Sequence, residues 1–318
     1  MLGILKRFKE FGLVGINKRN AGYTLTYNSR KNYPLVDDKL KTKQLAMDAG
    51  LAVPELYGVI DSVGQLKCCL EEILSPYSQF VVKPAQGSGG DGILVIADKF
   101  EKDWQTVNGQ ILGICDIEQH ISNILSGIYS LSGMPDKAMI EYCVQFDPLF
   151  SEISYQGVPD VRIIVFQGVP VMGMVRLPTR KSSGKANLHQ GAIGLGVDMS
   201  CGKTLTGVQE NKIIEIHPDT RNSIVGVQIP QWDKLLEIAS GCYELCGLGY
   251  LGVDIVLDRD FGPLILELNA RPGLAIQIAN RVGLESRLER VKKAQLNAAP
   301  ISDRVAYAKA EFANKIIL

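Results

Sequence analysis

The stretch VDIVLDRDFGPLILELNARPG, residues 253–273, contains two runs rich in valine, isoleucine and leucine. Each run predicts a buried strand, yet the two strands carry Asp254, Glu267 and Asn269. Burial of a carboxylate is costly unless a cation, a metal ion or hydrogen bonds compensate its charge. The stretch therefore predicts a hairpin whose polar side chains face a compensating group.

The spacing within this hairpin predicts its register. A four-residue turn after Asp258 pairs Asp258 with Pro263 and places Asp254 directly opposite Glu267. Asn269 follows Glu267 by two residues and therefore faces the same side of the sheet. The side chains expected on the opposite side, in the core, are Leu264, Leu266 and Leu268.

Two carboxylates and a carboxamide on one face are typical ligands for a hard cation. Mg²⁺ commonly takes one or two protein carboxylates and keeps positions for substrate phosphates. The alternative interpretation is a salt-bridge cluster, for instance with Arg271.

The composition is that of an ordinary globular enzyme. The 318 residues are 46% hydrophobic, and the 34 basic residues balance the 34 acidic ones, so no sequence-wide charge for nucleic acid is present. The seven cysteines form no CxxC motif, which indicates reduced thiols and a cytoplasmic location. No apolar run reaches the roughly 18 residues of a transmembrane helix.

The N-terminus contains apolar residues at helical spacing, namely Ile4, Leu5, Phe8 and Phe11. We expect this segment to pack on its own core or on a second subunit of an oligomer. A peripheral contact with a membrane or a partner is the alternative.

Hydrophobic periodicity predicts a small α+β lobe first. Its helices are expected at residues 37–49, with Asp37 or Asp38 as the cap and Gly50 as the end, at 65–75 and at 116–131. Its strands are expected in QFVVKP, ILVIAD and KAMIEYCVQ. From residue 160 onward strands dominate, with VRIIVFQ and PVMGMVRLP, a polar loop to about residue 190 and a helix at 231–246.

A glycine-rich loop follows the strand that ends near Lys83. The segment from Gly87 to Gly92 contains four glycines, so backbone N–H groups of residues such as Gly89 and Gly90 can approach phosphate oxygens. Lys83 would add a point charge. A tight hairpin without a ligand is the alternative.

Other polar residues allow similar chemistry. The loop at 176–191 carries cations and donors that would neutralise phosphate charge, or that form a solvated loop: Arg176, Arg180, Lys181, Lys185, Asn187 and His189. His189 is also a candidate general base or a hydrogen-bonding residue. Lys39 and Lys43 lie one helical turn apart, so they share a helix face. This face would bind an anion, or it is simply exposed to solvent. Glu141 and Tyr142 follow the strand KAMI, where backbone amides and an acidic side chain can contact a nucleotide base or ribose.

Taken together, DDKLKTK, FVVKPAQGSGGDG, IEY, PDVR, KANLHQGA, LGVDIVLD and LILELNARPG resemble the ATP-grasp superfamily over about residues 36–285. The resemblance is greatest to the ribosomal-protein α-L-glutamate ligase group and its relatives. It implies an α+β ATP-grasp fold, in which two lobes sandwich ATP. The implied domains are an N-terminal segment at 1–35, shortened relative to the family, a small lobe at 36–143 and a large lobe with the metal site at 144–318.

The resemblance also implies residue roles. Lys39 and Lys83 match the ATP-phosphate lysines, and Asp254, Glu267 and Asn269 match the ligands of Mg²⁺, with Mn²⁺ as an alternative. Further nucleotide contacts are implied for Glu141, Tyr142, Asp160, Lys185 and Asn187. The residues implied to bind the carboxylate substrate or to stabilise an acyl phosphate are Arg162, Arg176 and Arg271. Lys185 replaces the arginine of close relatives.

The implied reaction is ATP-dependent ligation of a carboxylate to an amine through an acyl phosphate. Glutamate or a similar amino acid would be joined to a peptide or protein. The alternatives are a phosphotransferase and a non-catalytic, nucleotide-sensing partner protein. Residues 145–158 exceed the length found in the ligases and are expected to form an added loop over the nucleotide.

Overall fold

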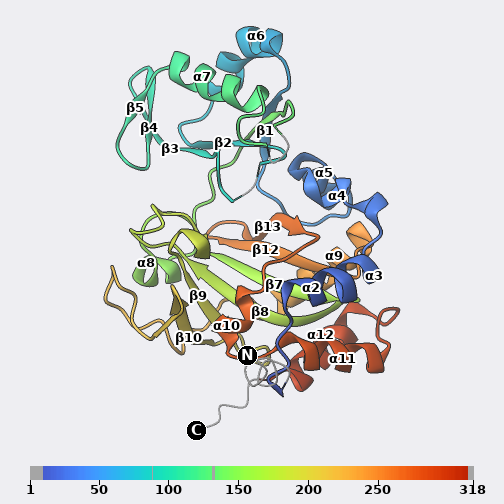
Figure 1. Ribbon diagram of the computed structural model, residues 1–318. Helices are drawn as coiled ribbons and strands as arrows, with labels where there is room; N and C mark the ends of the chain where they lie inside the picture. The colour runs from blue at the N-terminus through green and yellow to red at the C-terminus, as the bar shows by residue number, and fades with distance from the viewer. Residues whose placement is uncertain (1–9, 88, 131–132, 314–318) are drawn as a thin grey trace. The chain divides into compact units, whose positions relative to one another are not determined.

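The computed structural model describes residues 10–87, 89–130 and 133–313, and this part of the chain forms two compact units (Figure 1). The large unit comprises the described residues up to 37, together with 45–52 and those from 146 onward. The small unit comprises 38–44 and the described residues of 53–145. The helix α5, Lys39–Asp48, contributes its first residues to the small unit and its last residues to the large unit.

The small unit is built on a six-stranded antiparallel sheet in the order β1-β6-β2-β3-β4-β5. The strands are β1 Leu56–Ile60, β2 Phe80–Pro84, β3 Leu94–Phe100, β4 Asp103–Thr106, β5 Ile111–Leu112 and β6 Ala138–Glu141. The helices α6 (Val63–Leu74) and α7 (Ile114–Leu125) pack against each other. On α6 the leucines at positions 66, 70 and 74 lie one helical turn apart and are all buried.

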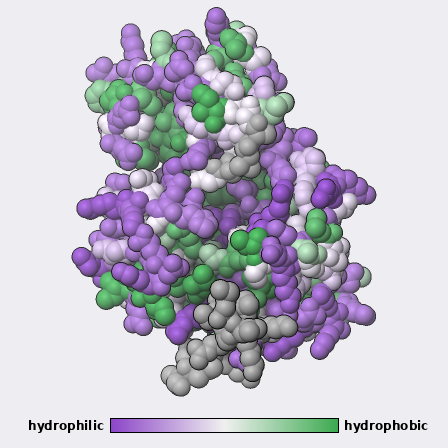
Figure 2. Space-filling model, in the orientation of Figure 1, coloured by the Kyte–Doolittle hydropathy of each residue, from purple (hydrophilic) through white to green (hydrophobic). Residues whose placement is uncertain are grey.

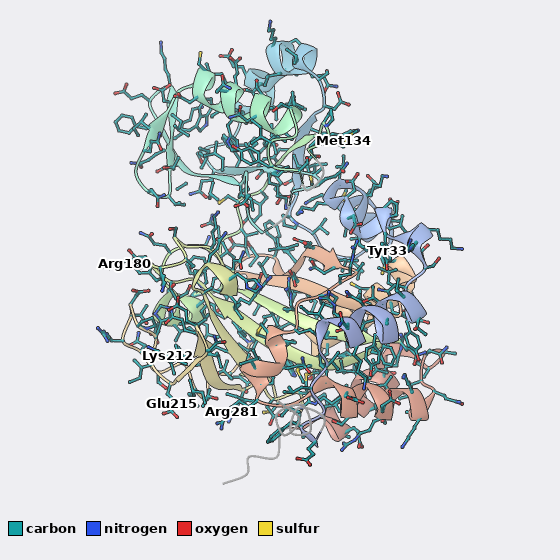
Figure 3. All side chains as sticks on the ribbon, in the orientation of Figure 1. Tyr33, Met134, Arg180, Lys212, Glu215 and Arg281 are labelled. Carbon is teal, nitrogen blue, oxygen red and sulfur yellow. The ribbon has the colours of Figure 1, made fainter. Side chains whose placement is uncertain are left out.

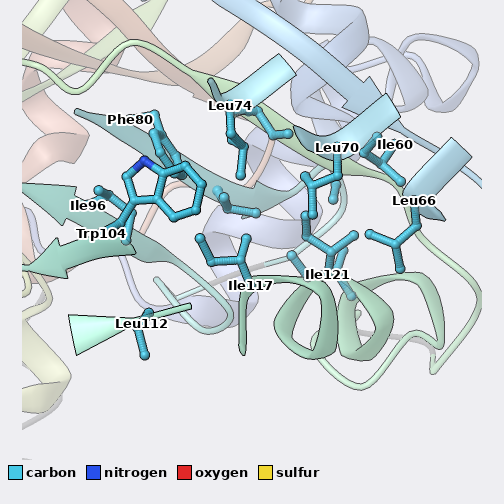
Figure 4. Close-up of a cluster of buried hydrophobic side chains, with 14 residues drawn as sticks. Ile60, Leu66, Leu70, Leu74, Phe80, Ile96, Trp104, Leu112, Ile117 and Ile121 are labelled. Atoms are coloured by element: carbon cyan, nitrogen blue, oxygen red, sulfur yellow. The ribbon is translucent and has the colours of Figure 1, made fainter. Parts of the chain in front are cut away.

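The core of this unit lies between these helices and the sheet (Figure 4). Leu70 and Ile121 from the helices meet Phe80 and Ile96 from the strands, all with at most 1% of their surface exposed. Trp104 packs edge-on to Phe80, with 6.0 Å between ring centroids. This core fixes β2 and β6, which carry Lys83 and Glu141.

Most of the predicted helices and strands are confirmed. Asp38 caps α5, since its Oδ1 accepts hydrogen bonds from the backbone N–H groups of Leu40 and Lys41 at 3.0 and 3.2 Å. The helix predicted at 116–131 ends earlier, at Leu125, because the chain turns at Gly127 with φ of +83°.

The large unit contains a seven-stranded sheet in the order β11-β10-β9-β8-β7-β12-β13, in which neighbouring strands are antiparallel. The strands are β7 Asp160–Phe166, β8 Val169–Leu177, β9 Ile193–Val197, β10 Thr204–Gln209, β11 Lys212–Ile214, β12 Tyr250–Asp258 and β13 Gly262–Asn269. The helices are α8 Leu149–Ile153, α9 Trp232–Cys246, α10 Ala275–Asn280, α11 Leu284–Ala294 and α12 Ile301–Glu311. α9 packs on β7, β8 and β12, and α12 packs on α9.

The described N-terminal residues dock onto the large unit as short helical turns. These are α2 Ile16–Lys18, the π-helix η1 Arg19–Thr24, α3 Leu25–Tyr27, the 3₁₀ turn η2 Arg30–Asn32 and α4 Pro34–Asp37. The buried Asn28 side chain accepts from Tyr250 N at 2.8 Å and donates to Tyr250 O and Ala270 O at 2.7 and 3.0 Å. Tyr23 packs against Phe166 and Tyr250.

The β12–β13 hairpin confirms the predicted pairing of Asp254 with Glu267, but its tip differs. Asp258 pairs with Gly262 instead of Pro263, because Asp258 Oδ1 accepts from Asp260 N and Phe261 N and closes a shorter turn. A bulge next to Asp254 restores the predicted register. Leu268, opposite Val253, is buried on the face away from Asp254 as predicted, and Leu266, at the bulge, is only partly buried. The prediction is wrong for Leu264, which is buried but pairs with Val256 and therefore shares the face of Asp254.

None of the helices in the described part of the chain combines the length and hydropathy of a membrane-spanning segment. On the face seen in Figure 2, hydrophilic side chains predominate and hydrophobic ones are scattered among them. Of the apolar residues in the predicted N-terminal helix, Ile4, Leu5 and Phe8 lie outside the described residues, and Phe11 is 70% exposed.

Candidate functional site

Four charged side chains meet on one face of the large sheet. Asp160 and Arg162 lie on β7, Arg176 lies on β8 and Asp254 lies on β12. In the strand register Asp160 pairs with Arg176, and Arg162 pairs with Asp254. Residues two apart on a strand share a face, and cross-strand partners are near enough to touch. The fold therefore gathers two arginines and two carboxylates into one cluster, which we call the arginine–aspartate cluster.

Asp254 is the centre of this cluster. Arg162 donates from Nε to Asp254 Oδ1 at 2.7 Å and from Nη2 to Oδ2 at 2.5 Å. Arg176 Nη2 donates to the same Oδ2 at 2.8 Å and also binds both oxygens of Asp160. Because Asp254 is only 3% exposed, these charge-assisted bonds supply the compensation that the sequence requires.

The two carboxylates differ in proton affinity. Burial raises the pKa of Asp160 to about 6, and the neighbouring Asp254 charge adds to this effect while Arg176 opposes it. Burial acts on Asp254 too, but Arg162 and Arg176 outweigh it and lower the pKa of Asp254 to about 2. The lower pKa belongs to the carboxylate that two guanidinium groups share.

Glu267 and Asn269 provide oxygen atoms beside the arginine–aspartate cluster. Asn269 Nδ2 donates to Asp254 Oδ2 at 3.2 Å, which leaves the Asn269 Oδ1 oxygen as an acceptor. Among the residues that the structure describes, none hydrogen-bonds or ion-pairs with the half-buried Glu267 carboxylate. A half-buried carboxylate that no described residue hydrogen-bonds or ion-pairs is available to a cation.

These atoms fit a magnesium ion in part. Glu267 and Asn269 offer hard oxygen ligands, the type that Mg²⁺ prefers. Asp254, the third predicted ligand, accepts three hydrogen bonds at Oδ2 and one at Oδ1, so Oδ1 is the oxygen that keeps a lone pair for a metal. Over the described ranges, no three side chains of the His, Cys, Asp or Glu type are grouped as a metal site. The metal assignment of the three residues stays a prediction.

The small unit holds a second charged cluster, which we call the lysine–glutamate cluster. Glu141, on β6, forms ion pairs with Lys83 on β2 and with Lys43 on α5, the latter at 2.9 Å. All three residues are buried, and Lys43 also donates to the Pro54 carbonyl oxygen. Burial lowers the pKa of Lys43, as does the Lys83 charge, while Glu141 opposes both. The Glu141 side chain, predicted near the base or ribose, is here a counter-ion for two lysines.

Lys39 and the glycine-rich loop adjoin each other within the small unit. Lys39 Nζ donates to the backbone oxygen of Gly87. Gly89 and Gly90 have φ of +67° and +82°, and a Cβ at Gly92 would lie 2.5 Å from the Tyr129 ring. Glycine adopts such a backbone without strain, so these positions favour glycine over residues with a side chain.

The other predicted nucleotide contacts are Tyr142 in the small unit and Lys185 and Asn187 in a loop of the large unit. The backbone N–H of Tyr142 donates a hydrogen bond to the Glu55 carbonyl oxygen at 2.8 Å. Asn187 Oδ1 accepts from His189 N at 3.0 Å and caps η3, Leu188–Gln190. His189 is exposed, and Lys185 is half-buried in the same loop.

The cations of this loop also differ in their surroundings. Arg180, labelled in Figure 3, lies 5.1 Å from the Tyr155 ring centroid, and the exposed Lys181 pairs with Glu210. Of the residues predicted to contact a carboxylate substrate, Arg162 and Arg176 come together in the arginine–aspartate cluster. Arg271 does not join them: its Nη2 lies 3.8 Å from Asp37 Oδ2, and its guanidinium lies over the Tyr33 ring.

Sequence reasoning missed the role of Lys43. It interprets the Lys39–Lys43 pair as one surface, whereas Lys43 is 5% exposed. The signal was present in Glu141, which follows the buried run AMI and therefore needs a cation nearby. The sequence singled out Arg162 and Arg176 as substrate-binding candidates, and did not predict that they pair with Asp254.

The chain is an ATP-grasp protein, because a model of an ATP-grasp family matches most of its length. More narrowly, the chain belongs to the sugar-transfer associated ATP-grasp family, whose model matches residues 18–293. No curated protein is significantly similar to it in sequence.

Solved structures of three ligases are similar at low identity. The ATP-grasp ligase PsnB, solved with a minimal precursor, is 16% identical with a TM-score of 0.47, over 85% of this chain and 64% of PsnB. D-alanine–D-alanine ligase from Bacillus anthracis is 15% identical with a TM-score of 0.41, over 88% and 69%. L-amino acid ligase from Bacillus licheniformis is 12% identical with a TM-score of 0.43, over 78% and 43%. The chain thus spans less than two thirds of the length of PsnB.

Proposed function

We propose that this protein is an ATP-dependent carboxylate–amine ligase that uses Mg²⁺. The observation that carries the proposal is the row of Arg162, Asp254, Glu267 and Asn269 across three neighbouring strands, with Arg176 beside it. This row combines fixed cations with oxygen ligands on one face, which is what transfer of a phosphoryl group requires. Membership of an ATP-grasp family supports the same reading.

The proposed reaction has two steps. A substrate carboxylate attacks the γ-phosphate of ATP, which gives an acyl phosphate and ADP. An amine then attacks the acyl carbon and releases phosphate, which gives an amide. A bound Mg²⁺ would neutralise phosphate charge and orient the transferred group. The chain itself needs no nucleophilic side chain, because positioning and charge stabilisation do the chemical work.

Each cluster has a part in this proposal. Lys39 and Lys83 bind phosphate oxygens, and the glycine-rich loop covers them with backbone amides. Glu141 holds Lys83 in place, since the two form a buried ion pair. Glu267 and Asn269 hold the metal ion, while Asp254 orients Arg162 and Arg176 toward the reacting group. As the substrate class we propose glutamate or a similar amino acid, joined to a peptide or protein, on the resemblance of the sequence motifs alone.

The first test is release of ADP and phosphate from Mg-ATP with pools of amino acids, each with and without amine acceptors. Mass spectrometry then identifies the product. A product heavier than the amine by one acid less water establishes ligation. A phosphorylated alcohol indicates a phosphotransferase, and ATP binding without release in any pool indicates a nucleotide sensor.

Glu267→Gln tests the metal assignment. We expect ADP release to fall about 100-fold or more, because loss of a metal ligand removes several kcal/mol of charge stabilisation. The thermal unfolding temperature should change little, since this carboxylate is half-buried and hydrogen-bonds no described residue.

The matched control is Glu210→Gln, which removes an exposed carboxylate paired with Lys181 in the same unit. This control should turn over at the wild-type rate. Equal rates for the Glu267 variant and the control would rule out Glu267 as a metal ligand.

A further inference from the structure

A cavity of about 420 Å³ lies within the large unit. This volume falls in the range of small-molecule sites. The residues that line it are Asn20, Thr24, Leu25, Arg30, Tyr33 and Arg271. Five of the six come from the N-terminal segment, and the sixth follows the β12–β13 hairpin, so we call it the N-terminal pocket.

The N-terminal segment is shaped to build this pocket. Asn20 and Thr24 belong to the π-helix η1, a rare form of helix that occurs often at functional sites. Arg19 donates to the Pro272 carbonyl oxygen at 3.1 Å and thereby joins η1 to the chain that follows β13. The buried Thr24 hydroxyl hydrogen-bonds no residue in the described part of the chain. Because that oxygen exposes less than 1 Å² of surface, it is enclosed by protein and does not reach a ligand in the pocket.

The charge of the pocket is positive. Arg30 and Arg271 both line it, and none of its lining residues is acidic. Within the described chain, the exposed Arg30 guanidinium makes no hydrogen bond or ion pair. Arg271 stacks on Tyr33 with 5.1 Å from guanidinium carbon to ring centroid, and its contact with Asp37 is long, at 3.8 Å between exposed groups. Figure 3 labels Tyr33 on the short helical segment that forms this wall.

One lining residue of the pocket, Arg271, is close in the chain to the residues proposed to hold the metal ion. Arg271 follows Asn269 by two residues, so their Cα atoms are at most about 7 Å apart. A molecule held by Arg271 is therefore within one small-molecule length of Asn269 and Glu267. Leu25 and Tyr33 offer apolar surface for the carbon part of such a molecule.

We propose that the N-terminal pocket binds the acid substrate, a small molecule with a carboxylate that Arg30 and Arg271 recognise. This inference rests on the proposed ligase function and specifies its substrate site. Two guanidinium groups match the planar geometry of a carboxylate, and the Asn20 carboxamide lines the pocket beside them. The N-terminal segment, although short, thus supplies a substrate site.

The test measures binding without turnover. Succinate, L-glutamate and L-alanine are titrated by ligand-observed NMR and thermal shift, with and without Mg²⁺ and a non-hydrolysable ATP analogue. Succinamide and L-alaninamide are the counterparts that lack the carboxylate, and inorganic phosphate tests for a phosphate group. We expect at least one acid to bind. Its amide should have a Kd that is higher by about tenfold or more.

Arg30→Gln should weaken binding of that acid about tenfold or more and leave ATP binding unchanged. Arg259→Gln, which removes an exposed arginine elsewhere in the unit, should bind like the wild type.

The proposal is overturned if none of the three acids binds under either condition, if Arg30→Gln binds as tightly as the wild type, or if phosphate binds the pocket more tightly than the acids. These outcomes are separate from the ligase proposal. If an acid supports ADP release and Arg30→Gln does not change this, the ligase proposal stands and the pocket proposal is rejected. If acid binding depends on Arg30 but no acid supports ADP release, the pocket proposal stands and the ligase proposal is rejected.

Discussion

Asp254 shows how a single buried residue depends on its neighbours. Arg162, Arg176 and Asn269 all donate to its carboxylate, which is almost entirely buried. A buried charge whose partner is removed destabilises a protein far more than an exposed one. Asp254 is therefore both a candidate site residue and a structural one.

Asp254→Asn should lower the free energy of unfolding of the large unit by about 3–5 kcal/mol, because the two arginines lose their shared counter-ion. Asp260→Asn is the control, since Asp260 is 53% exposed and pairs only with its neighbour Arg259; we expect a change within about 0.5 kcal/mol. Urea unfolding measures both. A loss for Asp254→Asn no larger than that of the control contradicts the cluster's structural role.

His217 gives the large unit a pH dependence. The ring is fully buried, its Nε2 contacts the Pro178 oxygen at 3.1 Å, and its Nδ1 accepts from the N–H groups of Asp219 and Thr220. Burial lowers the pKa of His217 below its ordinary value of 6.5. The unfolded chain therefore takes up a proton at a higher pH than the folded chain, so the stability is complete above pH 6.5 and is lost as the pH falls.

His217→Gln should remove this dependence. Between pH 8 and pH 5 the wild type should lose more stability than the variant, in urea titrations at both pH values. Asp160, Asp254 and the other carboxylates titrate in both proteins, so the difference isolates the histidine. Parallel losses in the two proteins would show that the native ring accepts a proton as readily as the unfolded one.

At the scale of elements, the glycine-rich loop is constrained by its surroundings. Gly92 has φ of +75°, and an added Cβ would meet the Tyr129 ring at 2.5 Å. Gly64, within α6, has nothing within 4 Å of its Cβ position and no positive φ. The two glycines therefore respond to the same substitution in opposite directions.

Gly92→Ala should destabilise the small unit by about 1–3 kcal/mol and weaken ATP binding, because both the backbone and the contact are strained. Gly64→Ala should stabilise the same unit by about 0.5–1 kcal/mol. Thermal unfolding and nucleotide titration of both variants check the pair. Equal stability of the two variants would contradict the loop conformation.

The sequence predicts elements best where the pattern is local. The helix predicted at 65–75 and the cap predicted at Asp37 or Asp38 needed only nearby residues, and the structure has α6 at Val63–Leu74 and the cap at Asp38. The hairpin tip could not be predicted, because the Asp258 side chain competes with strand pairing for the backbone N–H groups. The Arg162–Asp254 pair joins residues 92 apart in the sequence, and only the sheet order brings them together.

At the scale of the whole molecule, each unit has its own core and its own tryptophan. Trp104 is buried in the small unit and Trp232 in the large one, and they are the two tryptophans of the sequence. Labelling with 5-fluorotryptophan therefore gives one ¹⁹F signal for each unit. The unfolding transition seen at Trp232 should shift in Asp254→Asn, and that seen at Trp104 should shift in Gly92→Ala.

The bulge beside Asp254 has a consequence for how the hairpin can vary. A shorter turn with the bulge and a longer turn without it both leave Asp254 opposite Glu267. The bulge takes up one residue between the turn and the Asp254–Glu267 pair, so the length of the turn does not by itself set the alignment of that pair. We therefore expect that residues 259–261 at the tip can be substituted without changing the alignment of Asp254 with Glu267.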